Sequence, residues 1–441
     1  MPMWDQQAEA MSTDERAALQ SQRLGGLLTR LARTSPFYQR HLAEAGVEPG
    51  ATITLDDLTS LPFTTKPDLW DHYPWGMLTI PREEVVRVHA SSGTGGRPTL
   101  SAYSRKDLRI WAEVCARALG CAHADHSTTV QVSYGYGLFT GGLGLHQGAE
   151  LMGCAVVPAS SGQSARQVAL LRDLGAEVLC CTPSYAARLG EVLVEEGIEA
   201  EQLALRVGIF GAEPWSEALR GKLEAALGLK ALDIYGLAEV IGPGVACECL
   251  EAQNGLHVNE DHFLVEVIDP SNETPVAVGE RGELVFTTLT REAMPLLRYR
   301  TGDVATLDRS PCSCGRTLVR MSKVLGRVDD MLVVRGVNVY PSEVEAALLA
   351  EPGVGSQYLL VVDRTQTMAA LEVVCELAGA EPAGADQVEG VRAAVAVALE
   401  RRLGLRPVVR VLPAGALPRV EVGKAKRVVE RTAESDPLAS R

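Results

Sequence analysis

The chain lacks the features that mark membrane and secreted proteins. Its 441 residues contain no run of about 18 or more apolar residues, so we expect no transmembrane helix. The first residues, MPMWDQQAEA, carry acids and lack a basic start followed by an apolar stretch, so we expect no secretory signal. The sequence therefore predicts a cytoplasmic protein without a membrane partner.

The chain also lacks an excess of basic residues. Its formal net charge of −14 argues against a nucleic-acid partner, which would require a basic stripe on the surface. Small anions stay open as ligands, because a few cations and backbone N–H groups can hold a phosphate on an acidic protein. Hydrophobic residues at 46% and charged residues at 22% are typical of a soluble globular protein. The length predicts two or three domains.

The hydrophobic pattern changes twice along the chain. Residues up to about 50 have helical spacing. From about residue 85 to 320, short β-branched runs alternate with helical stretches, which predicts a layered α/β domain with a mostly parallel sheet. The β-branched runs lie at 84–90, 128–134, 154–159, 177–183, 205–211 and 230–236, and two of the helical stretches at 164–175 and 185–197.

A smaller domain is predicted after residues 326–330. Strand-like runs occur at 331–341, 354–364, 368–378 and 407–415, and helix-like segments at 341–351 and 385–404. We expect Ser342 to cap the first of these helices. The sequence thus predicts an α/β protein with a large layered N-terminal domain, residues 1–326, and a smaller α+β C-terminal domain, residues 327–441.

A glycine-rich loop between His89 and Thr99 is the sharpest local motif. Glycines and hydroxyl side chains let backbone N–H groups converge on an anion, and one cation adds charge. The loop has neither Walker spacing nor a G-x-G-x-x-G pattern, so a plain surface turn stays open as the alternative. The candidate phosphate ligands are Ser91, Ser92, Gly93, Thr94, Gly95, Gly96 and Arg97.

Further motifs follow in a fixed order. They are Gly211-Ala-Glu-Pro-Trp215, Asp233-Ile-Tyr-Gly-Leu-Ala-Glu239, Tyr299-Arg-Thr-Gly-Asp303, Gly326-Arg-Val-Asp-Asp330 and Gly423-Lys-Ala-Lys-Arg427. This ordered set resembles the adenylate-forming superfamily of acyl-CoA ligases. Segments such as Leu61-Pro-Phe-Thr-Thr-Lys66, Gly255-Leu-His-Val-Asn-Glu-Asp-His-Phe263 and Arg335-Gly-Val-Asn-Val-Tyr-Pro341 narrow the resemblance to the phenylacetate–CoA ligase family. It extends from about Trp4 to Glu430.

The resemblance implies an ATP-dependent ligase for an aryl carboxylic acid, with phenylacetate as the expected substrate. Such an enzyme forms an acyl-adenylate with ATP and Mg²⁺ and then passes the acyl group to coenzyme A. One alternative replaces coenzyme A by a carrier protein or another acceptor. A second is a nucleotide-binding regulator without turnover, suggested because Gly95 and Arg97 depart from the family's usual Ser-Ser-Gly-Thr-Thr-Gly-Lys run. A homodimer would be unsurprising for this family.

Two catalytic residues are implied by the resemblance. Lys424 would bridge the attacking carboxylate and the α-phosphate, and Glu239 would bind Mg²⁺ through a hard carboxylate oxygen. Asp303 would accept hydrogen bonds from both ribose hydroxyls, and Arg327 would contact ribose or phosphate. The adenine-binding residues implied are Tyr235, which would stack on the base, with Gly211, Ala212, Glu213, Pro214, Asp233 and Gly236.

The resemblance also implies movement of the small domain. Asp329 matches the hinge about which the C-terminal domain swings between an adenylating and a thioester-forming arrangement. In the second arrangement, the strand at 335–337 would face the active site. A plain interdomain salt bridge of Asp329 stays open as the alternative.

Aromatic residues set among glycines are candidates for the acid pocket. Flat side chains can wall an apolar slot, and small residues leave room for a ring. The candidates are Tyr134, Tyr136, Phe139, Gly141 and Ala212. The alternative is that these aromatics belong to the ordinary core.

Two Cys-x-Cys pairs suggest a metal site. Cys249, His257, Cys312 and Cys314 supply three thiolates and one imidazole, enough for a closed tetrahedral Zn²⁺ site of structural kind. Cys247 could replace His257 as the fourth ligand. The alternative is four reduced, unconnected cysteines, which is also our interpretation of the remaining cysteines in apolar stretches.

Overall fold

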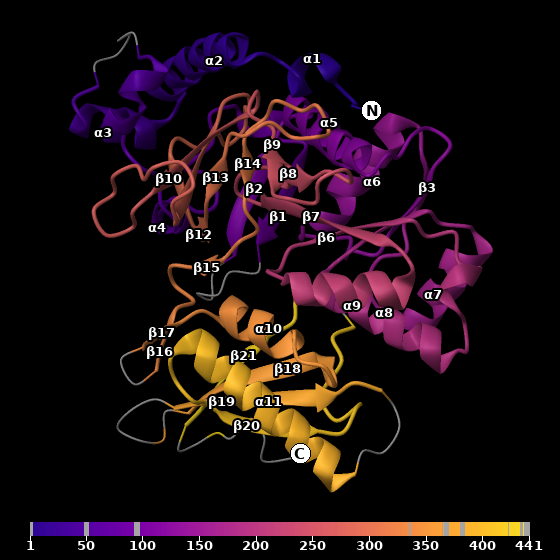
Figure 1. Cartoon of the computed structure of the whole chain (residues 1–441). Helices are drawn as coiled ribbons and strands as arrows, with labels where there is room; N and C mark the ends of the chain where they lie inside the picture. The colour runs from indigo at the N-terminus through magenta and orange to yellow at the C-terminus, as the bar shows by residue number, and fades with distance from the viewer. Residues whose placement is uncertain are drawn as a thin grey trace.

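The structure is a computed structural model that describes residues 3–47, 53–91, 98–334, 337–363, 365, 370–379, 384–421, 423–432 and 435. Figure 1 shows a large body, which runs from the N-terminal helices to β15 (Gly326–Arg327), and a small body in orange to yellow below it. None of the described helices is long and apolar enough to cross a lipid bilayer.

Helices open the chain and lie across one side of the large body (Figure 1). They are α1 (Gln6–Glu9), α2 (Thr13–Thr34) and α3 (Pro36–Glu44). Ser12 caps α2, because its hydroxyl accepts from the Glu15 N–H while the Glu15 carboxylate accepts from the Ser12 N–H. Leu24 and Leu31 on the inner face of α2 are fully buried. The short elements η1 (Leu55–Ser60), α4 (Lys66–Asp71) and η2 (Arg82–Glu84) follow.

A nine-stranded sheet of order β13-β14-β9-β8-β7-β6-β5-β3-β4 forms the centre of the large body. Its parallel strands are β3 (Thr129–Val132), β4 (Ala155–Val157), β5 (Val178–Cys181), β6 (Val207–Gly211) and β7 (Lys230–Leu237). The helices around them are α5 (Arg105–Cys121), α6 (Gly141–Met152), α7 (Ser164–Asp173), α8 (Pro183–Glu195) and α9 (Glu217–Leu227), with η3 (Ala200–Gln202). The alternation of strands and helices predicted from the β-branched runs is confirmed here.

The rest of this sheet differs from the mostly parallel sheet that we predicted. It runs antiparallel through β8 (Gly242–Glu248), β9 (Leu256–Val258), β14 (Arg320–Met321) and β13 (Leu307–Asp308). Residues 238–334, all of them described, contain no helix. Antiparallel neighbours can be joined by short turns, so this half lacks the helix–strand alternation on which the prediction rested.

A second sheet and a hairpin complete the large body. The sheet has the order β10-β11-β12-β15, and β1 pairs with β2. Their bounds are β1 (Arg87–Ser91), β2 (Thr99–Tyr103), β10 (Phe263–Ile268), β11 (Gly282–Thr288) and β12 (Tyr299–Ala305). In the antiparallel pairing of β12 and β15, Asp303 lies opposite Arg327. The last strand of the large body thereby brings two predicted ribose ligands together.

The small body is an α+β unit, as predicted. Its sheet has the order β20-β19-β18-β21, with a separate hairpin of β16 and β17. The elements are β16 (Leu332–Val334), β17 (Val337–Val339), α10 (Pro341–Leu349), β18 (Val354–Asp363), β19 (Ala370–Leu377), α11 (Ala385–Leu403), β20 (Val408–Leu412) and β21 (Val428–Arg431). The last strand, which we did not predict, pairs parallel to β18 and follows the Lys424 segment directly.

The prediction that Ser342 caps α10 is wrong. Pro341 occupies the first helical turn, where its missing N–H costs nothing, so the helix begins earlier and Tyr340 stands at the cap position. The Ser342 hydroxyl instead donates to the carbonyl of Leu325, at the end of the large body. Ser342 thus contributes to the junction between the two bodies.

Candidate functional site: a nucleotide site between the two bodies

Asp303 is the centre of the candidate ribose site. The Tyr235 hydroxyl donates to its Oδ2 at 2.7 Å, and the Arg327 Nη1 donates to its Oδ1 at 2.7 Å. Burial raises the pKa of Asp303, while Arg327 acts to lower it. Each carboxylate oxygen has a second lone pair, so Asp303 can still accept from both hydroxyls of a ribose.

Tyr235 and the turn after β6 form the candidate adenine site. The Tyr235 ring stacks against Phe286, with centroids 6.0 Å apart and planes at 28°. Gly211 must be glycine here, because a Cβ would collide with the carbonyl oxygen of Ile234 on the next strand. Ala212 has a φ of +73°, a strained value for a residue with a side chain. Such strain in a turn beside Tyr235 is typical of a ligand-binding site.

Glu239, the candidate magnesium ligand, is buried and held on two sides. The Tyr299 hydroxyl donates to its Oε1 at 3.3 Å. The guanidinium of Arg291 donates to the backbone carbonyl of Glu239 and to that of Val240 at 2.9 Å. A fixed carboxylate oxygen at this point fits a hard cation such as Mg²⁺.

Lys424 lies in the same site, although it comes from the small body. Its ammonium interacts electrostatically with Glu213, Asp303 and Glu239, all residues of the large body. The side chain keeps contact with solvent, yet the protein crowds it enough that desolvation lowers its pKa. The structure therefore brings together both predicted catalytic residues and the predicted ribose ligand.

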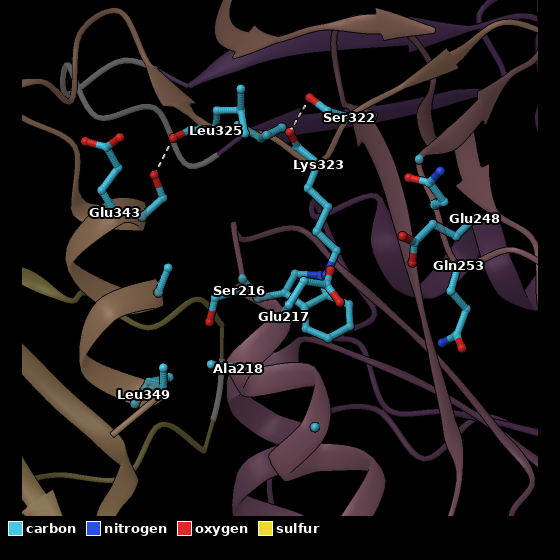
Figure 2. Close-up of a pocket in the computed structure, with 18 of the residues that line it drawn as sticks. Ser216, Glu217, Ala218, Glu248, Gln253, Ser322, Lys323, Leu325, Glu343 and Leu349 are labelled. Atoms are coloured by element: carbon cyan, nitrogen blue, oxygen red, sulfur yellow. Dashed lines mark hydrogen bonds and ion pairs between the residues drawn. The ribbon is translucent and has the colours of Figure 1, made fainter. Parts of the chain in front are cut away.

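Trp215, Ser216 and Glu217, which follow the adenine turn, border a cavity of about 1380 Å³ between the bodies. Burial raises the pKa of Asp233 to about 7, although the nearby Lys323 ammonium acts to lower it. Figure 2 shows Lys323 extending toward Glu217 at the start of α9, with Glu343 of α10 across the cavity. The Lys323 ammonium lies 2.7 Å from the Glu217 carboxylate and 3.7 Å from the centre of the Trp215 ring. The cavity lies behind the adenine turn and apart from Asp303.

Three of the acid-pocket candidates meet. The rings of Tyr134 and Phe139 lie 6.2 Å apart, and a Cβ on Gly141 would collide with both. Because Gly141 has no side chain, the space beside the two rings stays open. The Tyr136 hydroxyl lies 3.1 Å from the Nδ1 of His146, on the following helix. Tyr136, Phe139 and Ala212 are partly buried against the core of the large body, whereas Tyr134 is fully buried in it.

Several predicted residues fall outside the described part of the chain. They are Ser92, Gly93, Thr94, Gly95, Gly96 and Arg97 of the phosphate loop, and Arg335 and Gly336 of the strand expected to face the thioester-forming site. Ser91, the first phosphate-loop candidate, is the final residue of β1 and half-buried.

Asp329, the predicted hinge, is exposed and lies between β15 and β16. The Arg327 guanidinium donates to its carboxylate at 2.8 and 3.1 Å. This pair lies within the segment that joins the bodies. The hinge candidate is thereby linked through Arg327 to Asp303 in the ribose site.

The four metal-site candidates converge in the large body. Cys249 follows β8, His257 lies on β9, and Cys312 and Cys314 lie in the turn before β14, which pairs with β9. Their ligand atoms all lie within 4.8 Å of one another. The Sγ atoms of Cys249 and Cys312 are 3.7 Å apart, and Cys314 Sγ is 3.4 Å from His257 Nε2. Cys247 instead directs its thiol toward the carbonyl of Glu248 at 3.4 Å, so the geometry favours His257.

Sequence comparisons agree with this site. The profile described as AMP-binding enzyme matches residues 31–289, and the profile described as AMP-binding enzyme C-terminal domain matches residues 336–432. The class of protein is thus an adenylate-forming enzyme. A phenylacetate-coenzyme A ligase of Thermus thermophilus is 48% identical over 97% of this chain and 99% of its own length. One of Escherichia coli is 45% identical over 96% of each chain. The chain belongs to the phenylacetate–CoA ligase family.

Solved structures share this fold, and two states of one ligase differ in how well they match this chain. A 2-hydroxyisobutyryl-CoA ligase in the postadenylation state, in complex with 2-HIB-AMP, matches with a TM-score of 0.92 at 30% identity, over 98% of this chain and 93% of that one. The same ligase in the thioesterification state, with 2-HIB-AMP and CoA, matches with a TM-score of 0.73 over the same shares. The two bodies here are therefore arranged as in the first of these states.

Sequence reasoning missed residues whose hydrogen bonds hold Glu239 in place. Tyr299 belongs to a motif that we singled out, but only the fold shows its hydroxyl on Glu239. Arg291 lies in no motif, and its contacts with β2 and with Glu239 join segments 190 and 52 residues away, respectively. An arginine is rarely buried without partners, so the positive charge of Arg291 was the one signal of its role in the sequence.

Proposed function

We propose that the chain is an ATP-dependent aryl acid–CoA ligase, with phenylacetate as its substrate. In the first half-reaction, a carboxylate oxygen of the acid attacks the α-phosphorus of ATP and pyrophosphate leaves. In the second, the sulfur of coenzyme A attacks the acyl carbonyl, AMP leaves and the thiol proton is released. Acid, ATP and coenzyme A are consumed, and acyl-CoA, AMP and pyrophosphate are produced.

The observation that carries this proposal is the position of Lys424. Its ammonium interacts electrostatically with Glu213, Asp303 and Glu239 of the large body, and the adjacent Ala425 N–H donates to the Glu213 Oε2 at 3.0 Å. A positive charge fixed there can stabilise the negative charge that develops between carboxylate and α-phosphate, without a covalent enzyme intermediate. Asp303 and Arg327 would orient the ribose, and Tyr235 would stack on adenine beside the strained turn at Ala212.

We further propose that Glu239 holds Mg²⁺. When bound, the ion would neutralise phosphate charge during adenylation. Tyr299 and Arg291 fix the Glu239 carboxylate and backbone before the nucleotide arrives, which reduces the reorganisation that binding requires. Of the acid pocket, Tyr134, Phe139 and Gly141 are proposed to enclose the aryl ring.

The proposal is tested by mass spectrometry of acyl-CoA after the protein is mixed with ATP, Mg²⁺, coenzyme A and a panel of aryl acids. Phenylacetyl-CoA as the dominant product is the expected result. A different thioester would keep the mechanism and change the substrate. Acid-dependent pyrophosphate release without any thioester would indicate a carrier-protein or other acceptor, and neither product would overturn the proposal.

We also propose that Cys249, His257, Cys312 and Cys314 bind one structural Zn²⁺. A tetrahedral site with Zn–S distances of about 2.3 Å places its sulfurs about 3.8 Å apart, which the 3.7 Å between Cys249 and Cys312 matches. The turn that carries two of the ligands is tied to the N-terminal helices, because Arg316 pairs with Glu9 at 2.6 Å. The ion would thus fasten the sheet edge to the start of the chain.

Elemental analysis of protein purified without added zinc tests this site. We expect about one zinc per chain, and a large loss of bound zinc with a lower melting temperature in Cys312→Ser. Cys375→Ser, which removes a buried thiol of the small body far from the site, is the matched control and should keep its zinc. The proposal would be contradicted by wild-type protein that holds no zinc and has the same melting temperature as Cys312→Ser.

A further inference from the structure

The segment that carries Lys424 is tied to the large body by charged side chains before the lysine and by a backbone N–H after it. It connects β20 to β21, and its described residues are 413–421 and 423–427. The Glu421 carboxylate accepts from the Ser164 hydroxyl at 2.5 Å and from the Arg188 Nε at 3.2 Å. Arg419 donates to the Glu191 carboxylate at 2.7 Å.

A backbone contact next to the lysine completes the attachment. The Ala425 N–H donates to the Glu213 Oε2 at 3.0 Å, and the other oxygen of Glu213 accepts from the Ser184 N–H at 2.9 Å. Ser184 belongs to the first turn of α8, where free N–H groups favour an anionic partner. The Lys424 segment therefore meets α7, α8 and the adenine turn at three points.

We propose that Ser164, Arg188 and Glu191 form a dock on α7 and α8 that positions the Lys424 segment for adenylation and releases it for thioester formation. This inference rests on the proposed function. None of the three residues belongs to the nucleotide site; they act through Lys424 and are positioning residues. Arg188 and Glu191 lie on one face of α8, one turn apart, so a single helix face presents a cation to Glu421 and an anion to Arg419.

The strength of these contacts suits reversible attachment. The side chains of Glu421 and Arg188 are 43% and 17% exposed. Ion pairs with such access to solvent are weak and are screened by salt. Several weak contacts acting together can hold an arrangement that one conformational change then breaks at once. A single apolar interface of the same size would be harder to leave.

The two half-reactions, measured separately, test the dock. Acid-dependent exchange between pyrophosphate and ATP reports adenylation, and conversion of supplied phenylacetyl-adenylate with coenzyme A reports thioester formation. We expect Glu421→Ala to slow the exchange about three- to tenfold, with thioester formation unchanged or faster. Raising NaCl from about 0.05 to 0.5 M should slow exchange in the wild type and have little effect in the variant.

The matched control is Glu195→Ala. Glu195 also pairs with Arg188, at 2.6 Å, but does not touch the Lys424 segment, so its loss should leave both half-reactions unchanged. The charge-swapped pair, Arg188→Glu with Glu421→Arg, should recover part of the exchange rate that each single change removes. Equal losses in both half-reactions, or no loss in exchange, would overturn the dock.

A readout without turnover separates this inference from the proposed function. Hydrogen exchange measured by mass spectrometry should show faster exchange at 423–427 in Glu421→Ala than in wild type, whatever the substrate. Unchanged exchange there would overturn the dock alone. Faster amide exchange in a protein that forms no acyl-adenylate would support the dock and overturn the proposed function.

Discussion

Ion pairs inside the large body differ from those that join the two bodies. Inside the large body, Arg117 is 2% exposed and donates to both oxygens of Asp261 at 2.8 and 3.1 Å. Between the bodies, the cation of Arg281 is 55% exposed and lies 3.8 Å from Glu343 of α10. Arginine–carboxylate pairs thus fix one region internally and join it only loosely to the other.

This difference would let one chain be rigid within the large body and still release the Lys424 segment as we propose. A buried charge whose partner is lost stays unsolvated, so buried pairs resist separation. An exposed pair exchanges its partner for water at little cost. The large body would therefore keep Asp303 and Glu239 in place during the proposed movement of the small body, which carries Lys424.

The largest expected effect lies in the buried pair. Arg117→Met should lower the free energy of unfolding by about 3–5 kcal/mol, because it leaves the Asp261 carboxylate buried without its main partner. Arg281→Met, in the exposed contact with Glu343 between the bodies, should cost less than about 1 kcal/mol. Equilibrium urea unfolding measures both. Similar losses in the two variants would remove the distinction between the regions.

The next effect concerns Lys424, the residue that the small body contributes to the large one. Lys424→Ala should slow adenylation by about 100- to 1000-fold, as expected for the loss of a group that stabilises transition-state charge. Thioester formation from supplied acyl-adenylate should stay within a few-fold of the wild type. Lys426→Ala is the matched control, since it removes the neighbouring cation of the same segment. A parallel fall in both half-reactions would show that Lys424 has a different role.

A smaller effect should follow from stiffening the junction. Asp329→Pro fixes one backbone dihedral in the segment that joins the bodies, so thioester formation should slow by about tenfold while adenylation changes little. Asp329→Ala is the control, because it also removes the carboxylate held by Arg327 but leaves the backbone free. Stopped-flow assays of each half-reaction measure the two rates. Equal effects of Pro and Ala would assign the change to the lost ion pair.

Local signals in the sequence predicted much of the fold and the chemistry-bearing residues. The β-branched runs predicted β3 to β7, because β3, β5 and β6 are mostly buried and each strand from β3 to β6 is followed by a helix. The Cys-x-Cys spacing drew attention to Cys312 and Cys314, which lie in one turn, and to Cys249, whereas Cys247 of the first pair lies outside the candidate metal cluster. The ordered motifs predicted Lys424 and Asp303 through resemblance to a family.

Long-range contacts were beyond such reasoning. The antiparallel half of the central sheet has strands too short to stand out, as β13 and β14 have two residues each. The contact of Glu421 with Ser164 joins residues 257 positions apart, and neither belongs to a motif. Ser342 was misassigned because a cap-forming residue at the start of a helix can also serve a tertiary partner, here the Leu325 carbonyl.

The smallest expected effect is a change with pH that separates the two half-reactions. Desolvation by the surrounding protein lowers the pKa of Lys424 below its usual value of 10.5, even though Glu213, Asp303 and Glu239 favour the charged form. As the pH rises through that lowered pKa, the ammonium loses its proton, so adenylation should fall by up to about tenfold per pH unit. Thioester formation should hold or rise over the same range, because the thiolate is the nucleophile. In Lys424→Arg, whose guanidinium stays charged, the rate should be lower but the alkaline fall should disappear. If the adenylation rate of Lys424→Arg fell with the same slope at alkaline pH, the titrating group would be a different residue. The pH dependence of adenylation would then say nothing about the pKa of Lys424.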